Sequence, residues 1–346
     1  MIMRKELFNK KNKEDLKLDL KNEDFDRVTI SFYRYINLTN LEELRDQLYV
    51  KWRELNILGR VYIAEEGINA QLSVPEEKLN LFVDEVKSHK KFKDIIIKQA
   101  IVDGNSFYKL IIKIKKEIVA YKVTKNQYDM DTVGKHLNYK EFNDAIDNGA
   151  TVIDVRNYYE GEVGKFENAI IPDIDRSEDL LPEIKKMLKG QENNKILMYC
   201  TGGIRCEKAS SFLLKQGFND VNQLDGGIIK YATDVKKKGV KSKFIGKNFV
   251  FDSRLGEQIT DDIISNCHQC NNASNDHTNC ENSDCHILFI QCDTCRKKYL
   301  GCCSNKCLGF IKLNDDEKKD LISKNIIFNG TNSDRLRPKL RDLASD

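Results

Sequence analysis

Residues 195–210, KILMYCTGGIRCEKAS, decide the fold of the central part of the chain. The apolar run KILMY predicts a strand that is buried on both faces, and this strand delivers Cys200 at its end. The loop TGGIR follows, and the apolar spacing of CEKASSFLLKQGF predicts a helix that begins at about Cys206. This pattern favours a parallel sheet covered by helices, in which ligands bind beyond the carboxyl ends of the strands.

The segments on either side continue the alternation of strands and helices. TVIDVRN (151–157) and VNQLDGG (221–227) predict two further strands. NYKEFNDAIDNG (138–149) and LLPEIKKMLKG (180–190) predict short helices. We therefore expect an α/β domain with a parallel sheet and flanking helices over residues 138–235.

The loop after Cys200 has the residues expected of an anion-binding site at a helix N-terminus. Glycines allow its N–H groups to converge, and Arg205 adds charge-assisted donors. Such a field lowers the pKa of a thiol, so we expect Cys200 to be a nucleophile rather than a small buried residue of a core strand. Cys206 is either a resolving thiol or a packed residue of the first helical turn. The predicted anion loop comprises Thr201, Gly202, Gly203, Ile204, Arg205 and Cys206.

Residues 26–125 predict a separate α/β sandwich of ferredoxin type. Its expected order is βαββαβ-like, with helices over 41–56 and from Pro75 onward. The expected strands are 28–36, one long strand over 59–74, and two further runs, 94–102 and 107–123. Residues 1–25 alternate charges and are expected to form a loosely held arm.

The turn-like segment EEGINAQ (65–71) is open to two interpretations. It is a functional loop with Glu66 and Asn69 as polar candidates, or a turn built around Gly67.

A basic strand is a weak candidate for RNA binding. KLIIKIKK places three lysines on one face, opposite Leu110, Ile112 and Ile114. These lysines, with the lysine-rich run that starts at residue 236, form a possible path for an RNA backbone, and the alternative is a solvated lysine-rich face. The candidates are Lys109, Lys113, Lys115, Lys236, Lys237 and Lys238.

Nine of the eleven cysteines lie between Cys267 and Cys307, which favours metal binding over disulfides. Two CxxC pairs some twenty residues apart are typical of a zinc ribbon, and four ligands per ion make a closed, structural site. The alternatives are a metal-free thiol-rich loop and an iron–sulfur cluster. One predicted site comprises Cys267, Cys270, Cys292 and Cys295; the other comprises Cys280, Cys285, Cys307 and one of Cys302 or Cys303, of which we assign Cys303.

Composition limits the classes of function. The 346 residues carry 57 Lys and Arg against 54 Asp and Glu, so nucleic-acid contacts require local patches rather than a global excess of charge. No apolar run is long enough to span a membrane, and the N-terminal stretch lacks the apolar core of a signal peptide. We expect a cytoplasmic protein without a membrane partner.

The sequence resembles a known family of domains. VIDVRN (152–157), the loop from Cys200 to Arg205 and LDGGI (224–228) together resemble a rhodanese domain. The resemblance implies that Cys200 carries a persulfide whose charge the loop amides stabilise. Asp154 and Arg156 then act as supports at the end of their strand.

A closer resemblance covers roughly residues 25–310. AEEGINAQLS (64–73), YYEGEVGKFENAIIPDID (158–175), CTGGIRCEKAS (200–210), FVFDSRLGE (249–257) and the cysteine-rich segment are ordered as in the rhodanese-like tRNA uridine-34 hydroxylases. Lys165 stands where many rhodanese-type loops carry His, and Asn168 where Gly is common, so the rim of the pocket is expected to differ.

This resemblance implies an oxidoreductase that converts the wobble uridine of tRNA to 5-hydroxyuridine with molecular oxygen as co-substrate. Residue spacing alone indicates sulfur transfer, so a sulfurtransferase that passes on a Cys200 persulfide sulfur remains the alternative. A non-catalytic RNA-binding protein with a rhodanese scaffold is a third hypothesis. The electron donor and the oligomeric state stay open. The expected parts are an arm (1–25), the ferredoxin-like domain (26–125), the rhodanese domain (138–235), a basic linker (236–260), a cysteine-rich module (261–312) and a polar tail (313–346).

Overall fold

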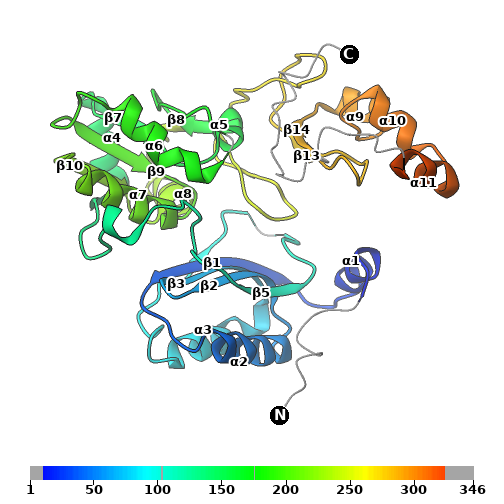
Figure 1. Ribbon diagram of the computed structural model, residues 1–346, viewed down its shortest axis with the longest axis horizontal. Helices are drawn as coiled ribbons and strands as arrows, with labels where there is room; N and C mark the ends of the chain where they lie inside the picture. The colour runs from blue at the N-terminus through cyan, green and yellow to red at the C-terminus, as the bar shows by residue number, and fades with distance from the viewer. Residues whose placement is uncertain (1–10, 103, 175, 324–346) are drawn as a thin grey trace.

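The computed structural model describes residues 11–102, 104–174 and 176–323. Its N-terminal domain is a five-stranded sheet of order β4-β1-β3-β2-β5, with two helices on one face (Figure 1). Strands β1, β3 and β2 pair antiparallel, as in a ferredoxin-like sandwich. The elements are α1 (Lys13–Lys21), β1 (Arg27–Tyr35), α2 (Leu41–Glu54), β2 (Leu58–Ala64), β3 (Gly67–Pro75), the 3₁₀ turn η2 (Glu76–Lys78), α3 (Leu79–Ser88), β4 (Lys98–Gln99), β5 (Leu110–Ile114) and η3 (Lys125–Gln127).

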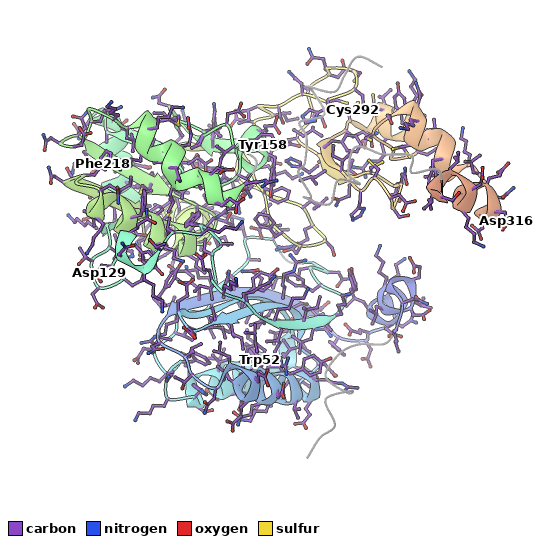
Figure 2. All side chains as sticks on the ribbon, in the orientation of Figure 1. Trp52, Asp129, Tyr158, Phe218, Cys292 and Asp316 are labelled. Atoms are coloured by element: carbon purple, nitrogen blue, oxygen red, sulfur yellow. The ribbon has the colours of Figure 1, made fainter. Side chains whose placement is uncertain are left out.

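The core of this domain lies between the sheet and its helices. Trp52 of α2 is fully buried there and makes edge-on contacts with Phe32, 6.3 Å away, and Phe82, 5.3 Å away (Figure 2). The opposite face of the sheet carries none of the described helices and faces the second domain (Figure 1).

The expectation of one long strand over 59–74 is wrong, because this segment is the β2–β3 hairpin. Ala64 pairs with Gly67, so Glu65 and Glu66 form the turn. Gly67 has φ +146°, and a Cβ there would lie 2.0 Å from the Arg34 carbonyl oxygen. The segment thus contains a tight turn that ends at Gly67, and the prediction of functional roles for Glu66 and Asn69 is a separate question.

Three other local expectations for this domain are corrected. Pro75 ends β3, and α3 begins only at Leu79, because the fixed φ of proline also suits an extended strand end. The two C-terminal runs shorten to β4 and β5, and Ile114, expected on the buried face, is 37% exposed at the end of an edge strand. The expected arm contains helix α1, whose Leu16 is buried; residues 1–10 lie outside the described part.

The second domain contains a four-stranded parallel sheet of order β6-β10-β9-β7. The parallel sheet was predicted, whereas the strand order and strand β6, which lies before the expected start of the domain at residue 138, were not. Helices α6 and α7 cover one face of this sheet, and α4 and α8 cover the other, since alternate residues of the strands join two separate apolar clusters. The elements are β6 (Lys135–Leu137), α4 (Tyr139–Asp147), β7 (Thr151–Asp154), α5 (Tyr158–Val163), β8 (Gly164–Phe166), α6 (Ser177–Met187), β9 (Lys195–Tyr199), α7 (Ile204–Lys215), β10 (Asp220–Leu224) and α8 (Gly227–Lys238).

Residues 236–260 are not a linker. They contain the last turn of α8 and two strands, β11 (Phe244–Asn248) and β12 (Glu257–Gln258). Strand β11 pairs antiparallel with both β8 and β12, so this basic segment is held against the second domain. Local charge did not reveal the strand because its partner β8 lies some eighty residues earlier in the chain.

The cysteine-rich module forms the third part of the molecule (Figure 1). Its elements are β13 (His277–Asn279), β14 (Leu288–Ile290), α9 (Asp293–Tyr299), α10 (Asn305–Ile311) and α11 (Asp315–Ser323). Helix α11 occupies the start of the expected polar tail, and residues 324–346 lie outside the described part. Among the described helices, none has both the length and the hydropathy needed to cross a membrane.

Candidate active site

Cys200 lies where β9 ends and the loop to α7 begins. Gly203 takes φ +100° immediately before the helix, a conformation that favours glycine. The start of α8 packs beneath the loop, since Ile228 N–H donates to the Cys200 carbonyl oxygen over 3.0 Å. A Cβ on Gly227 would lie 2.6 Å from that oxygen, so close packing there requires a glycine.

The surroundings of Cys200 favour its thiolate. The side chain is fully buried, which by itself raises the pKa. A hydrogen bond from the Cys206 thiol, the Arg205 guanidinium and the N–H groups of Cys206 and Gly203 outweigh burial, and the pKa falls to about 5. Gly203 N–H lies 3.1 Å from the sulfur. Two N–H groups of the predicted loop, those of Gly203 and Cys206, therefore contact the Cys200 sulfur.

The neighbouring Cys206 has the opposite electrostatics. Burial raises its pKa well above the ordinary value, and the adjacent Cys200 raises it further. Cys206 is therefore a thiol that donates to the Cys200 thiolate, and it is also packed in the first turn of α7. The geometry leaves both interpretations of Cys206 open, because its sulfur is next to that of Cys200.

A buried carboxylate, absent from our sequence prediction, holds Arg205. Glu160 of α5 is fully buried and binds the guanidinium through two contacts of 2.6 and 2.9 Å. Arg205 also donates to the Thr201 hydroxyl over 3.1 Å, which ties both ends of the loop together. One sequence signal was available, since Asn157 and Glu160 form a capping box at the start of α5.

Asp154 and Arg156 form a fully buried ion pair beneath the site. Arg156 binds Asp154 through two nitrogens and donates to the Gly164 carbonyl oxygen over 2.7 Å. The Tyr199 hydroxyl donates to the same carboxylate over 2.8 Å. These contacts tie β7, β8 and β9 together and do not reach the Cys200 sulfur, so the pair fits a supporting position.

The N-terminal domain and the segment after it contact the carbonyl side of the Cys200 loop. Lys98 donates to the Gly202 oxygen, Tyr35 to the Ile204 oxygen and Tyr121 to the Arg205 oxygen. With the carbonyl groups held from that side, the N–H groups remain available to the sulfur. These contacts join residues 84 to 169 positions apart, and no local sequence pattern announces them.

A buried lysine fastens the two domains together. Lys208 of α7 has no exposed surface, and its ammonium lies 2.9 Å from Glu66 and 2.7 Å from Glu117. Glu66 also accepts from the Ile118 N–H over 2.8 Å. The polar candidate of the EEGINAQ turn is thus part of the domain contact next to the site.

Between the domains lies a cavity of about 370 Å³. Its walls come from the helix-free face of the N-terminal sheet, the loop after Cys200 and residues 250–257. Asn69, the second polar candidate of the turn segment, lines it. Lys165 lines a different groove, beside Cys267, and Asn168 takes φ +58°, a conformation that asparagine tolerates.

The cysteine-rich module assembles two four-sulfur groups. In each, the sulfur atoms all lie within 4.8 Å of one another, and three measured pairs are 3.6 to 3.7 Å apart. A tetrahedral ion with bonds of about 2.3 Å separates its sulfurs by about 3.8 Å, so the thiols fit one ion per group. The groups are Cys267, Cys270, Cys292, Cys295 and Cys280, Cys285, Cys303, Cys307, which leaves Cys302 outside both.

The candidate RNA-binding lysines fall on two domains. Lys113 and Lys115 are exposed at β5, and Lys109 is half-buried. Lys236, Lys237 and Lys238 are exposed in the last turn of α8. The lysine at 113 continues the helix-free face that lines the cavity, because it pairs with Tyr62 of β2.

Family models match three consecutive parts of the chain: a UPF0176 acylphosphatase-like domain at residues 27–118, a rhodanese-like domain at 138–234 and a rhodanase C-terminal domain at 245–308. A protein of Leptospira interrogans serogroup Icterohaemorrhagiae serovar Lai (strain 56601), named tRNA uridine(34) hydroxylase, is 50% identical over 97% of this chain and 93% of its own. Relatives of the same name occur in Enterobacter sp. (strain 638), 45% identical over 90% of both chains, and in Pectobacterium carotovorum subsp. carotovorum (strain PC1), 44% identical over 92% of this chain and 90% of its own.

Proposed function

The chain belongs to the tRNA uridine(34) hydroxylase family, and we propose that it hydroxylates C5 of the wobble uridine of tRNA in the cytoplasm. The single observation that carries the proposal at the level of residues is the buried Cys200 thiolate, with its pKa of about 5, beside an interdomain cavity. In this proposal tRNA is the partner, and molecular oxygen is the co-substrate. One oxygen atom enters the base and the other leaves as water, which requires two electrons and two protons from a donor outside this chain.

The residues have distinct proposed roles. Cys200 is the reactive group, and the loop N–H groups with Arg205 stabilise its negative charge, whether on a thiolate or on a persulfide. Glu160 is a positioning residue that fixes the guanidinium over the loop. Asp154 and Arg156 hold the strands beneath. The two cysteine groups are proposed to hold structural zinc, because each offers four thiolates and no open position.

A sulfurtransferase remains the second candidate, because a nest of amides around Cys200 suits a persulfide sulfur equally well. The basic residues of β5 and α8 are proposed to contact the tRNA backbone in either case.

Nucleoside mass spectrometry of tRNA from a deletion strain tests the proposal. We expect 5-hydroxyuridine and its derivatives to be absent from the deletion strain. The wild-type gene should restore them, and the Cys200→Ser gene should not, since the serine hydroxyl does not ionise near neutral pH. Cys302→Ser, a buried cysteine outside both metal groups, is the matched control and should restore the modification. Loss of a thiolated base instead would favour sulfur transfer, and unchanged tRNA would favour a binding role only.

A further inference from the structure

The cavity beside the Cys200 loop has an unusual wall. Alternate residues of the N-terminal strands turn away from their own core, and the strand register arranges them in two rows. Tyr33, Asn69 and Tyr62 are neighbours across β1, β3 and β2, and Ser31, Gln71 and Arg60 form the adjacent row. All six line the cavity. An open sheet face with aromatic, amide and cationic side chains is the kind of surface on which single-stranded RNA is read.

One cation of this wall is unpaired. The other two cavity arginines are neutralised, Arg205 by Glu160 and Arg254 by Asp252 and Glu257. The Arg60 guanidinium has no hydrogen-bond or ion-pair partner within residues 11–102, 104–174 and 176–323. A half-buried guanidinium without a carboxylate is suited to bind an anionic group of a ligand, and phosphate matches its planar donors.

A chain of amides fixes an acceptor on the same wall. Asn69 donates its Nδ2 to the Ile118 carbonyl oxygen, so its Oδ1 is the acceptor for Gln71 Nε2 at 2.6 Å. This orientation leaves Gln71 Oε1 as an acceptor without a donor among the described residues. The N3–H of uracil is a donor, whereas N3 of cytosine carries a lone pair, so the oxygen discriminates between the two pyrimidines.

The opposite wall offers an apolar ring. Phe251 is 41% exposed although it packs edge-on against Phe249, with ring centres 5.1 Å apart. Its ring centre lies 5.8 Å from the Arg205 guanidinium, which places it next to the Cys200 loop. An exposed phenylalanine inside a cavity is suited to stack on a base.

We propose that this cavity binds one uridine extruded from the RNA, with its base against Phe251, its N3–H on Gln71 Oε1 and a phosphate on Arg60. A cavity of about 370 Å³ falls within the size range of small-ligand sites. The inference rests on the proposed function, since it assigns the residues with which the cavity beside Cys200 recognises the uracil base of its substrate. Extrusion is the general way in which an enzyme reaches an atom of a base within a folded nucleic acid.

Binding of three anticodon stem–loop RNAs, with uridine, cytidine or an abasic site at the wobble position, tests the inference. Full-length wild-type protein should bind the uridine RNA roughly 5- to 150-fold more tightly than the abasic RNA, the range that stacking of one base provides. Phe251→Ala should abolish that ratio, and Gln71→Ala should abolish the preference for uridine over cytidine. Arg60→Met should weaken all three complexes and reduce the salt slope by about one.

Arg45→Met is the matched control. Arg45 lies on α2, on the other side of the sheet from the cavity, and forms an ion pair with Asp46. This variant should leave all the ratios unchanged. If folded Phe251→Ala and Gln71→Ala proteins keep the wild-type ratios of affinity among the three RNAs, the proposed uridine site is refuted. Binding does not require turnover, so a wild-type protein that shows these ratios but forms no 5-hydroxyuridine would refute the proposed function and leave this inference standing.

Discussion

The acidity of Cys200 has a consequence that can be measured directly. A pKa of about 5 instead of 9.0 means that about 99% of the side chain is thiolate at pH 7. Four pKa units correspond to about 5 kcal/mol of preferential interaction with the anion, since each unit is worth about 1.4 kcal/mol. The perturbation that tests the cause is Arg205→Met, which removes the charge and keeps a similar apolar stem.

We expect the alkylation rate of Cys200 by iodoacetamide, followed on its peptide by mass spectrometry, to rise with a midpoint near pH 5 in the wild type. Each rate profile is divided by its own plateau value, so that the low absolute rate at a buried sulfur does not affect the midpoint. Arg205→Met should raise the midpoint by about one to three units, the shift expected of one nearby opposite charge. Arg205→Lys should shift the midpoint less, because it retains the positive charge. A smaller shift is still expected, since lysine loses the two-point contact with Glu160.

The lowered pKa of Cys200 also makes the stability of the folded protein depend on pH. Because folding lowers the pKa of Cys200, its contribution is complete above pH 9 and is lost as the pH falls through 5. The free energy of unfolding of the wild type, relative to Cys200→Ala, should rise by about 1.4 kcal/mol per pH unit in this window. An alkylation midpoint between 8 and 9 in the wild type, or a stability difference independent of pH, would refute the electrostatic reasoning.

Three further outcomes are expected. Protein purified without added metal should contain up to two zinc ions per chain by elemental analysis, and a metal-free wild type of full stability would exclude these sites. Cys292→Ser should lower both metal content and thermal stability, whereas Cys302→Ser should retain the metal. Replacing Lys113 and Lys115 with Gln should weaken tRNA binding and flatten its salt dependence by up to two units of slope, and an unchanged slope would remove these lysines from the interface. Lys208→Met should lower the melting temperature by several degrees, because two carboxylates at the domain contact lose their cation. The double variant with Glu117→Gln should recover part of this loss, and equal melting temperatures for all three proteins would contradict the role of Lys208.

Much of the fold was predictable because its signals are local. The helix at α2 and the buried strand at β9 follow from apolar spacing over fewer than twenty residues. The errors occur where partners are distant. The hairpin over 59–74 reads as one strand because both of its arms have an extended pattern, and β11 reads as a linker because its partner β8 is remote.

The sequence by itself determined where Cys200 and its loop lie in the fold, since a strand end, two glycines and an arginine lie within six consecutive residues from Cys200. It also determined that eight of the nine clustered cysteines divide into two groups of four, but the membership of Cys303 instead of Cys302 depends on which sulfur lies close to those of Cys280 and Cys307. Folding alone decided the rest. Glu160 meets Arg205, 45 residues away, through packing within the second domain. The contact of Lys98 with the Gly202 carbonyl, 104 residues away, and the cavity itself arise where one domain packs on the other, because only tertiary packing brings together side chains so distant in sequence.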